Sequence, residues 1–236
     1  MPVAIITGAS KGLGRALGAA LAESGWNLVL DARTSGVLQE SATYVREHAK
    51  DGARVEALAG DVGDAAHRAA LVAAARGLGG LDLLVNNASA LGAEPLVRLA
   101  GLPLDGLRAA LETNVVAALG LVQESLPLLR ASAGGAVLNI SSDAAVEAYE
   151  TWGGYGASKA ALDHLSAVLG VEEPGIRVWS FDPGDMRTDL YRAAVPADDP
   201  AGRPLPERVV PAFLDVIARR PASGRYTAPA LLAGAR

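Results

Sequence analysis

The chain has 236 residues and a mass of 24.0 kDa, half of its residues are hydrophobic, and its formal net charge is -5. A chain of this length and apolar content can bury a large core as one α/β domain, which excludes an intrinsically disordered protein. The acidic balance is spread through the sequence and excludes the clustered basic face of a nucleic-acid-binding protein. The lack of cysteine excludes disulfides, thiolate nucleophiles and cysteine-bound metals.

Six short apolar runs without polar alternation predict buried strands, at residues 3–7, 27–32, 53–59, 81–85, 136–140 and 177–181. Longer stretches rich in Ala and Leu predict helices between them, at residues 14–24, 37–49, 65–76, 104–129 and 155–169. The longest helix is expected to be interrupted at Pro127, and a short seventh strand is expected at 224–226. Continuous apolar strands that alternate with helices are typical of a doubly wound parallel α/β sheet, so we expect one such domain over residues 1–236.

The sequence contains no stretch with the features of a targeting or membrane-spanning segment. Met1-Pro2 leads directly into an apolar strand, and no apolar run approaches the roughly 18 residues that a spanning helix needs. We therefore expect a cytoplasmic protein without a membrane partner. The proline-rich stretch 195–206 is the longest irregular segment, and we expect the region of about 188–206 to form a substrate loop.

A glycine-rich turn follows the first predicted strand, with the sequence Thr7-Gly8-Ala9-Ser10-Lys11-Gly12-Leu13-Gly14. Glycines there let the backbone approach a pyrophosphate, and the N-terminus of the next helix supplies free N–H groups and a favourable dipole. Strand-to-helix turns also use glycine for other reasons, so the cluster alone is weak evidence. Its place between a strand and a helix favours a dinucleotide site.

The spacing Thr-Gly-x-x-x-Gly-x-Gly resembles that of the short-chain dehydrogenase/reductase family, and further motifs follow in the family's order. They are Asp61-Val62, Asn86-Asn87-Ala88-Ser89, Asn114, Ser141-Ser142, Tyr155-x-x-x-Lys159 and Pro183-Gly184-x-x-x-Thr188. The resemblance covers about residues 3–190 and departs from the family at Ser89, where glycine is usual. It implies a Rossmann fold, ketoreductase-type chemistry on a small-molecule carbonyl or alcohol, and a homodimer or homotetramer.

The resemblance also implies which residues hold the cofactor. Asp61 would bind the adenine edge, although its context equally allows a helix N-cap region, and Asn86 would form the floor of the site. The turn after the sixth strand would hold the nicotinamide carboxamide, although Thr188 is also a credible N-cap. The implied set is Thr7, Gly8, Ser10, Lys11, Gly12, Leu13, Gly14, Arg33, Asp61, Val62, Asn87, Ala88, Tyr155, Lys159, Pro183, Gly184, Met186 and Thr188.

The end of the second predicted strand, Leu30-Asp31-Ala32-Arg33, bears on the choice between NADP(H) and NAD(H). A carboxylate there binds the ribose 2′-hydroxyl and repels a 2′-phosphate, whereas an arginine accepts the phosphate. By the resemblance, the acidic position of NAD-using relatives falls on Ala32, while Arg33 and Lys11 fall on basic positions of NADP-using relatives. We therefore expect NADP(H). A shift of one residue in register would instead bring Asp31 near the ribose and favour NAD(H).

Tyr155 and Lys159 are four residues apart in a predicted helix, so their side chains share one face. A tyrosine, whose unperturbed pKa is about 10, can act as acid/base where an ammonium and an oxidised nicotinamide stabilise its phenolate. The resemblance implies that Ser142 binds the substrate oxygen and that Asn114 holds a water linking Lys159 to solvent. Each residue alone also fits a cap or a helix surface. Their joint occurrence in family order favours a catalytic set of these four.

Three functions remain open from the sequence: carbonyl reduction with NADP(H), imine reduction or cofactor-assisted dehydration on the same fold, and non-catalytic NADP binding. Acidic residues near the expected pocket entrance, Asp143, Glu147 and Glu150, fit a neutral or cationic substrate but also a solvated loop. The three histidines show no metal-ligand spacing, so we expect no metal site and expect His67, like the others, to be a surface or helix-face residue.

Overall fold

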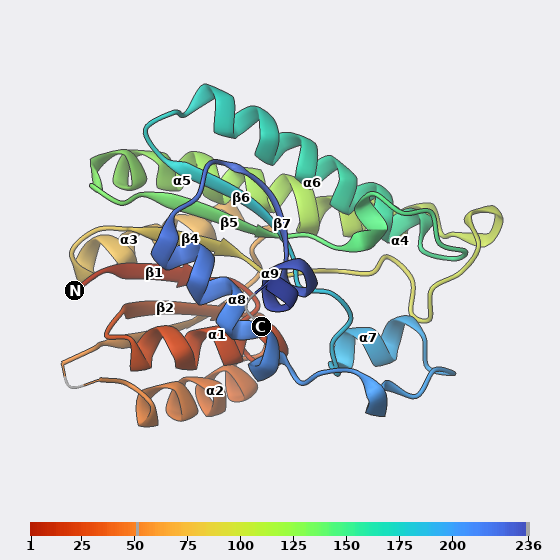
Figure 1. Cartoon of the computed structure of the whole chain (residues 1–236), viewed down its shortest axis with the longest axis horizontal. Coiled ribbons are helices and arrows are strands. Elements are labelled where there is room, and N and C mark those ends of the chain that lie inside the picture. Colours follow the sequence, from red (N-terminus) through yellow and green to blue (C-terminus); the bar gives the residue numbers. More distant parts are fainter. Residues whose placement is uncertain (51, 235–236) are drawn as a thin grey trace.

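In the computed structural model, which describes residues 1–50 and 52–234, seven strands form one parallel sheet in the order β3-β2-β1-β4-β5-β6-β7 (Figure 1). The strands are β1 (Val3–Ile6), β2 (Asn27–Ala32), β3 (Val55–Ala59), β4 (Leu83–Asn86), β5 (Ala136–Ile140), β6 (Arg177–Asp182) and β7 (Gly224–Thr227). The predicted doubly wound sheet is confirmed, and every predicted strand is present with ends within two residues of those expected. The winding direction changes between β1 and β4, where such sheets hold their ligands.

Helices cover both faces of the sheet (Figure 1). The helices of one face are α1 (Gly12–Glu23), α2 (Ser35–Glu47) and α8 (Pro206–Arg219), and those of the other are α3 (Ala65–Leu78), α5 (Ala117–Ala131) and α6 (Gly153–Glu172). Within β1, Ile6 packs in the first layer and Ile5 in the second. Strands buried on both faces have no polar alternation, which explains the continuous apolar runs.

The helix expected over residues 104–129 is present, but the prediction of an interruption at Pro127 is wrong. Pro127 lies inside α5, and the break is a π-helical turn, Glu112–Val116, between α4 (Leu104–Leu111) and α5. This turn carries Asn114, which is 1% exposed and hydrogen-bonded to Ala90 and Ser158. The break therefore coincides with hydrogen bonds that a buried amide makes to other segments, and a helical sequence pattern does not reveal such bonds. Single π-helical turns are frequent at functional sites.

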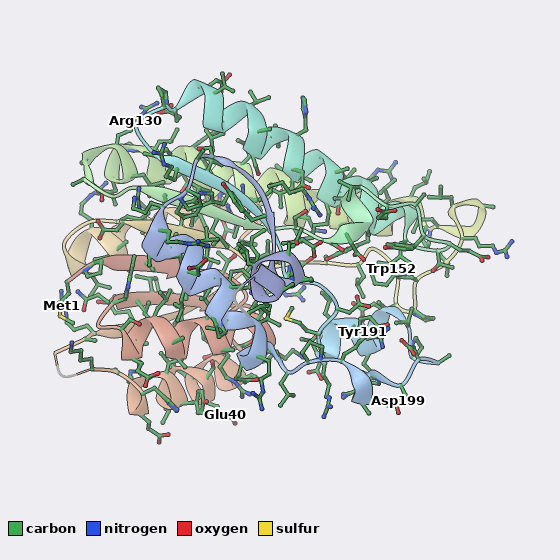
Figure 2. The ribbon with its side chains drawn as sticks, in the orientation of Figure 1. Met1, Glu40, Arg130, Trp152, Tyr191 and Asp199 are labelled. Atoms are coloured by element: carbon green, nitrogen blue, oxygen red, sulfur yellow. The ribbon has the colours of Figure 1, made fainter. Side chains whose placement is uncertain are left out.

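The loops that follow the strands gather at one edge of the sheet. Trp152, before α6, and Tyr191, in α7 (Asp189–Ala194), lie at this edge, on the opposite side of the molecule from Met1 (Figure 2). The chain closes with α9 (Ala228–Gly234), directly after β7. Among the residues described, no helix combines the length and the apolar content needed to cross a membrane.

Candidate active site

A cavity of about 680 Å³ runs along the carboxyl ends of the strands, from the ends of β2 and β3 to the loops around Trp152 and Tyr191. Most of the predicted site residues line it, namely Gly8, Ser10, Lys11, Gly12, Leu13, Arg33, Asp61, Val62, Asn87, Ala88, Ser142, Tyr155, Lys159, Pro183, Gly184, Met186 and Thr188. Thr7, Gly14 and Asn114 do not line the cavity and instead support residues that do. The cavity therefore lies where a doubly wound sheet is expected to hold its ligand.

The glycine turn between β1 and α1 is fixed to the end of β4 by hydrogen bonds. Thr7 Oγ1 accepts from the backbone N–H groups of Asn87 and Ala88, both at 3.0 Å. The Asn87 side chain donates to the carbonyl oxygens of Thr7 (2.8 Å) and Gly8 (3.0 Å). Gly8 has a φ of 64°, and a Cβ on Gly14 would lie 2.5 Å from the Gly8 carbonyl oxygen, so both positions require glycine.

A buried chain of polar groups lies under this end of the cavity. Asn86 Nδ2 donates to Asn139 Oδ1 at 2.8 Å, and Asn139 Nδ2 donates to Ser166 Oγ at 2.7 Å. All three side chains are buried, so these bonds join β4, β5 and α6 while satisfying polar groups that would be costly to leave unpaired. Asn86, implied to form the floor of the site, is thus a support beneath the lining residues.

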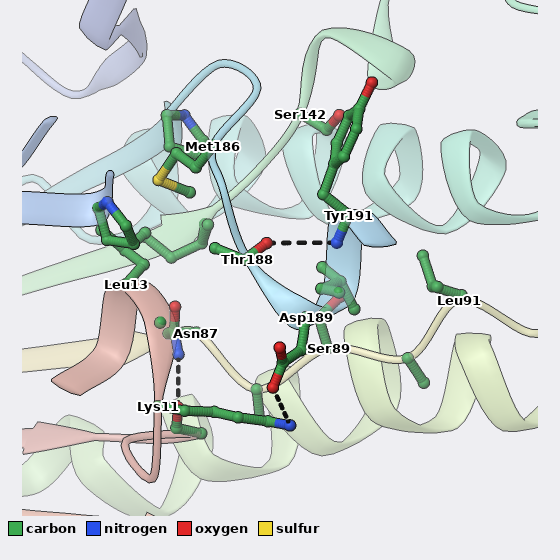
Figure 3. Close-up of a pocket in the computed structure, with 18 of the residues that line it drawn as sticks. Lys11, Leu13, Asn87, Ser89, Leu91, Ser142, Met186, Thr188, Asp189 and Tyr191 are labelled. Carbon is green, nitrogen blue, oxygen red and sulfur yellow. Dashed lines mark hydrogen bonds and ion pairs between the residues drawn. The ribbon is translucent and has the colours of Figure 1, made fainter. Parts of the chain in front are cut away.

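The N-terminus of α1 meets the cavity without a side chain capping it. Its first-turn N–H groups and the positive end of the helix dipole attract an anion. Lys11, implied to bind phosphate, lies with its Nζ 2.8 Å from Asp189 Oδ2 of α7 (Figure 3). The two side chains are 61% and 55% exposed, so this ion pair is weak and can open for a competing anion.

The end of β2 separates the two charges that bear on cofactor choice. Arg33 is exposed on the cavity wall and, in the part of the chain that the structure describes, makes no ion pair or side-chain hydrogen bond. Asp31 is 1% exposed, its Oδ1 lies 2.6 Å from His67 Nε2, and its Oδ2 accepts a long 3.4 Å bond from the Gly8 N–H. Burial raises the pKa of the Asp31 carboxyl, while the His67 contact opposes that rise.

His67 lies on helix α3, which agrees with the helix-face alternative, but the alternative of a surface position is wrong. Its side chain is only 10% exposed, because the ring points from α3 toward the sheet and meets Asp31. Histidine is polar and occurs both at surfaces and in interiors, so no hydrophobic periodicity reveals this inward orientation. A pairing across 36 residues is set by tertiary structure.

Asp61 closes a turn in its own segment, where its Oδ1 accepts a hydrogen bond from the Gly63 N–H at 2.8 Å. The helix cap that was the alternative for Asp61 belongs to Asp64, whose carboxylate accepts from the Ala66 N–H at 2.9 Å and begins α3. Asp61 and Val62 both line the cavity. Their positions are compatible with the implied contact to an adenine edge.

Tyr155 and Lys159 lie on the face of α6 that is packed against the cavity, and their side chains are nearly fully buried. Lys159 Nζ donates to the Ile140 carbonyl oxygen at 2.8 Å and lies 5.5 Å from the centroid of the Tyr155 ring. The Trp152 ring meets Tyr155 edge-on, with the centroids 5.7 Å apart. The Tyr155 ring therefore has the Lys159 ammonium and the Trp152 ring as close neighbours.

Burial dominates the electrostatics of this pair. It raises the pKa of the Tyr155 phenol to about 12 and lowers the pKa of Lys159 to about 8. Contact with Ser89 opposes the rise in the Tyr155 pKa, and the charges of Asp182 and Asp143 add to it. The charge of Asp163 opposes the fall at Lys159. In the protein alone, desolvation therefore favours the neutral form of both groups, and stabilisation of the phenolate by Lys159 together with an oxidised nicotinamide stays a prediction.

Ser142 combines the two roles that the sequence left open for it. Its Oγ accepts from the Ala144 N–H at 3.2 Å and donates to Asp143 Oδ1 at 3.0 Å, which caps the short 3₁₀ turn that follows β5. It also lines the cavity, as does Asp143. Glu147 and Glu150 are exposed and do not line it, so of the three acidic residues expected at the entrance Asp143 alone lines the cavity, together with Asp185 from the turn after β6.

Asn114 connects the cavity wall to the helix of Tyr155. Its Oδ1 accepts from the Ala90 N–H at 2.8 Å, and its Nδ2 donates to the Ala90 carbonyl oxygen (2.9 Å) and to Ser158 Oγ (2.8 Å). Ser158 in turn donates to the Tyr155 carbonyl oxygen at 2.7 Å. These contacts assign the Asn114 amide a scaffolding role, and the water-mediated link to Lys159 stays a prediction.

The turn after β6 is shaped by its own polar side chains. Asp182 Oδ1 accepts from the Gly184 N–H at 2.8 Å, and Gly184 has a φ of 71°. Thr188 Oγ1 accepts from the Tyr191 N–H at 3.2 Å and so caps α7 (Figure 3). The N-cap interpretation of Thr188 is therefore confirmed, while Thr188 also lines the cavity beside Met186.

Sequence reasoning missed Arg225 in β7, which ties three elements together behind the cavity. Its Nε donates to Asp163 Oδ2 at 3.1 Å, and its Nη2 lies 3.0 Å from the Ser142 carbonyl oxygen and 3.3 Å from Asp182 Oδ2. One guanidinium thus touches the end of β5, the end of β6 and α6. Local spacing offers no signal for such a contact, because the partners lie 43 to 83 residues away.

Comparison with known proteins agrees with this geometry. The short chain dehydrogenase family model matches residues 2–199. Sepiapterin reductase of Mus musculus is 35% identical over 202 residues, which cover 81% of this chain and 77% of that protein. D-erythrulose reductase of Gallus gallus is 32% identical over 196 residues, which cover 80% and 73%.

Solved structures of similar architecture include cofactor complexes. A short chain dehydrogenase from Shigella flexneri complexed with NADP has a TM-score of 0.88 at 26% identity, covering 97% of each chain. One from Escherichia coli complexed with NADPH has a TM-score of 0.87 at 26% identity, covering 96% of each chain. These likenesses span the sheet and the loops that form the cavity.

Proposed function

Since this chain belongs to the short-chain dehydrogenase/reductase family, we propose that it is an NADP(H)-dependent enzyme that interconverts a carbonyl compound and an alcohol. The substrate's carbonyl carbon gains or loses a hydride, and Tyr155 donates or accepts the proton of the substrate hydroxyl. The observation that carries this proposal is that the buried Tyr155 and Lys159 line the same cavity as the glycine turn.

The residues of this chain fit a dinucleotide. The N-terminus of α1 is uncapped, and a Cβ at Gly14 would collide with the turn that precedes it. We assign the pyrophosphate to this segment, the adenine to Asp61 and Val62, and the nicotinamide amide to the turn 183–188. When bound, the nicotinamide supplies or accepts the hydride.

The preference for NADP(H) rests on charges at the end of β2. Arg33 presents an exposed guanidinium, which binds a phosphate well, while the Asp31 carboxylate is buried against His67. The complexes of the Shigella flexneri and Escherichia coli relatives with NADP and NADPH support the same choice.

The high pKa of Tyr155 favours its action as an acid. With a pKa of about 12, the phenol keeps its proton at neutral pH and can donate it to a substrate oxygen that gains negative charge. Ser142 Oγ lines the same cavity, and its single hydroxyl proton can donate a second hydrogen bond to that oxygen when it turns away from Asp143 Oδ1. The Lys159 ammonium stabilises the phenolate that remains. The chain's own groups therefore favour the reductive direction.

Steady-state turnover with a panel of ketones, aldehydes and cyclic imines tests the proposal, with loss of NADPH absorbance as the readout. We expect the ketones or aldehydes to be reduced, and Tyr155→Phe to lower kcat by at least about 100-fold while NADPH still binds. Tyr226→Phe is the matched control, because the Tyr226 hydroxyl bonds to the Ala222 carbonyl oxygen and does not line the cavity. Activity of Tyr155→Phe near the wild-type level would exclude Tyr155 as the acid, and turnover of imines alone would assign the alternative reaction.

A further inference from the structure

Asp31 places a carboxylate at the cofactor cavity that no step of the proposed reaction uses. It lines the cavity and lies two residues before Arg33. A carboxylate in this region normally binds the ribose 2′-hydroxyl and opposes a 2′-phosphate. The Asp31 carboxylate would therefore repel the phosphate that Arg33 would accept, unless another group pairs with that carboxylate.

His67 is positioned to pair with the Asp31 carboxylate. Its Nε2 lies 2.6 Å from Asp31 Oδ1, within the length of a strong charge-assisted hydrogen bond. The opposite edge of the ring packs over Gly60, where a Cβ would lie only 2.2 Å from His67 Nδ1. The ring therefore has one available place, between the end of β3 and Asp31, and the absence of a side chain at Gly60 creates it.

The contact directs Asp31 away from a cofactor phosphate. Oδ1 is taken up by His67, which reaches it from α3, and Oδ2 faces the Gly8 N–H at 3.4 Å. The other charged side chains that line this end of the cavity are Asp61, Arg33, Lys11 and Arg15. Without His67, the Asp31 carboxylate would be unpaired near the expected phosphate position and would oppose the attraction of the phosphate to these cations.

We propose that His67 is a positioning residue that sets cofactor specificity, holding the Asp31 carboxylate against the glycine turn so that the site accepts a 2′-phosphate beside Arg33. The inference rests on the proposed NADP(H) function and adds a residue to it. It predicts that the discrimination between the two cofactors depends on a side chain that does not line the cavity.

The experiment measures dissociation constants of NADPH and NADH by titrating the cofactor fluorescence, with no substrate present. His67→Met keeps much of the bulk and removes the donor, and we expect the ratio Kd(NADH)/Kd(NADPH) to fall by about tenfold or more, since an unpaired like charge near a phosphate has at least that effect. His67→Gln keeps a side-chain N–H donor and should stay within about threefold of the wild-type ratio. The double variant His67→Met/Asp31→Asn should recover the ratio, because no carboxylate remains to be held.

Asp31→Asn alone keeps the test decisive if His67→Met fails to fold. We expect a ratio within about threefold of wild type, since the held carboxylate does not oppose the phosphate. A rise of tenfold or more would show that Asp31 acts on the cofactor directly and would overturn the inference. So would a folded His67→Met with a lower Tm but an unchanged ratio. Failure of the wild type to bind NADPH would instead overturn the proposed function.

Discussion

The cofactor end and the substrate end of the cavity are held together by different kinds of contact. At the cofactor end, buried hydrogen bonds join main chain to main chain or to short side chains, as between Thr7 and Asn87. At the substrate end, Arg203 pairs with Asp185 (3.2 Å) and Asp198 (2.9 Å) and stacks over the Tyr191 ring at 4.3 Å. These charged side chains are between 27% and 48% exposed.

The difference has a physical consequence. Hydrogen bonds from side chains such as Thr7 and Asn87 to backbone groups leave little room for substitution, because a buried backbone group that loses its partner carries the cost of desolvation. Exposed ion pairs are screened and contribute little each, so they can be exchanged without loss of the fold. The cofactor end is thus constrained by the fold, whereas the substrate end can accept substitutions without loss of the fold.

Lys159→Met should cause the largest loss, because it removes the cation beside the proton donor. We expect kcat for reduction to fall by about 100-fold or more. In the wild type, the ammonium is present below the Lys159 pKa of about 8 and is lost above it, so the reductive rate should fall as pH rises through about 8. Steady-state pH profiles measure this. Lys50→Met, at an exposed position outside the cavity, is the control, and a flat profile from pH 7 to 9.5 would contradict the prediction.

Gly14→Ala should weaken NADPH binding by about tenfold or more, since a close contact at a main-chain oxygen cannot be relieved by moving a side chain. The added Cβ would lie 2.5 Å from the Gly8 carbonyl oxygen and 2.7 Å from Asn87 Nδ2, and the turn would have to shift. Fluorescence titration gives the dissociation constant. Gly36→Ala is the matched control, because nothing lies within 4 Å of a Cβ there. Equal affinities for the two variants would show that the turn is not as rigid as its contacts indicate.

Lys159 and Gly14 both belong to motifs that were predicted from the sequence, and both were predictable for the same reason. The strands were predictable because burial on both faces leaves them continuously apolar. The glycine turn and the pair Tyr155 and Lys159 were predictable because their spacing is local, within one turn or one helical face. Local spacing is what a single sequence carries most directly.

The features that sequence reasoning missed all depend on distant partners. The His67 contact with Asp31 and the Arg225 contacts with Asp163 and Asp182 join segments that are separated by 36 to 62 residues. The rise in the Tyr155 pKa could not be predicted for a related reason, because the spacing of Tyr155 and Lys159 indicates a nearby cation but not how deeply the phenol is buried. Desolvation is a property of the assembled core.

Arg225→Met should have an intermediate effect, with kcat lowered several-fold to about tenfold because Ser142 and Asp182 lose a shared partner. The same change leaves the Asp163 charge unpaired, and that charge raises the Lys159 pKa. The fall in the reductive rate should therefore move to higher pH than in the wild type. A merely structural role would lower Tm and leave the pH midpoint in place. Arg219→Met removes an exposed ion pair on α8 and is the control.

Asp189→Asn should have the smallest effect, and its direction tests the contrast between the two ends. Asp189 competes with a cofactor phosphate for Lys11, and the Lys11 contact lowers the pKa of its carboxyl. Removing that competitor should tighten NADPH binding by about two- to threefold at low ionic strength, because exposed pairs of this kind are weak. The gain should vanish in high salt, where surface charges are screened. Asp105→Asn, which breaks an exposed pair with Arg108, should leave the affinity unchanged at both salt concentrations. Weaker NADPH binding in Asp189→Asn would mean that Asp189 positions Lys11 for the phosphate, and the substrate end would then take part in holding the cofactor.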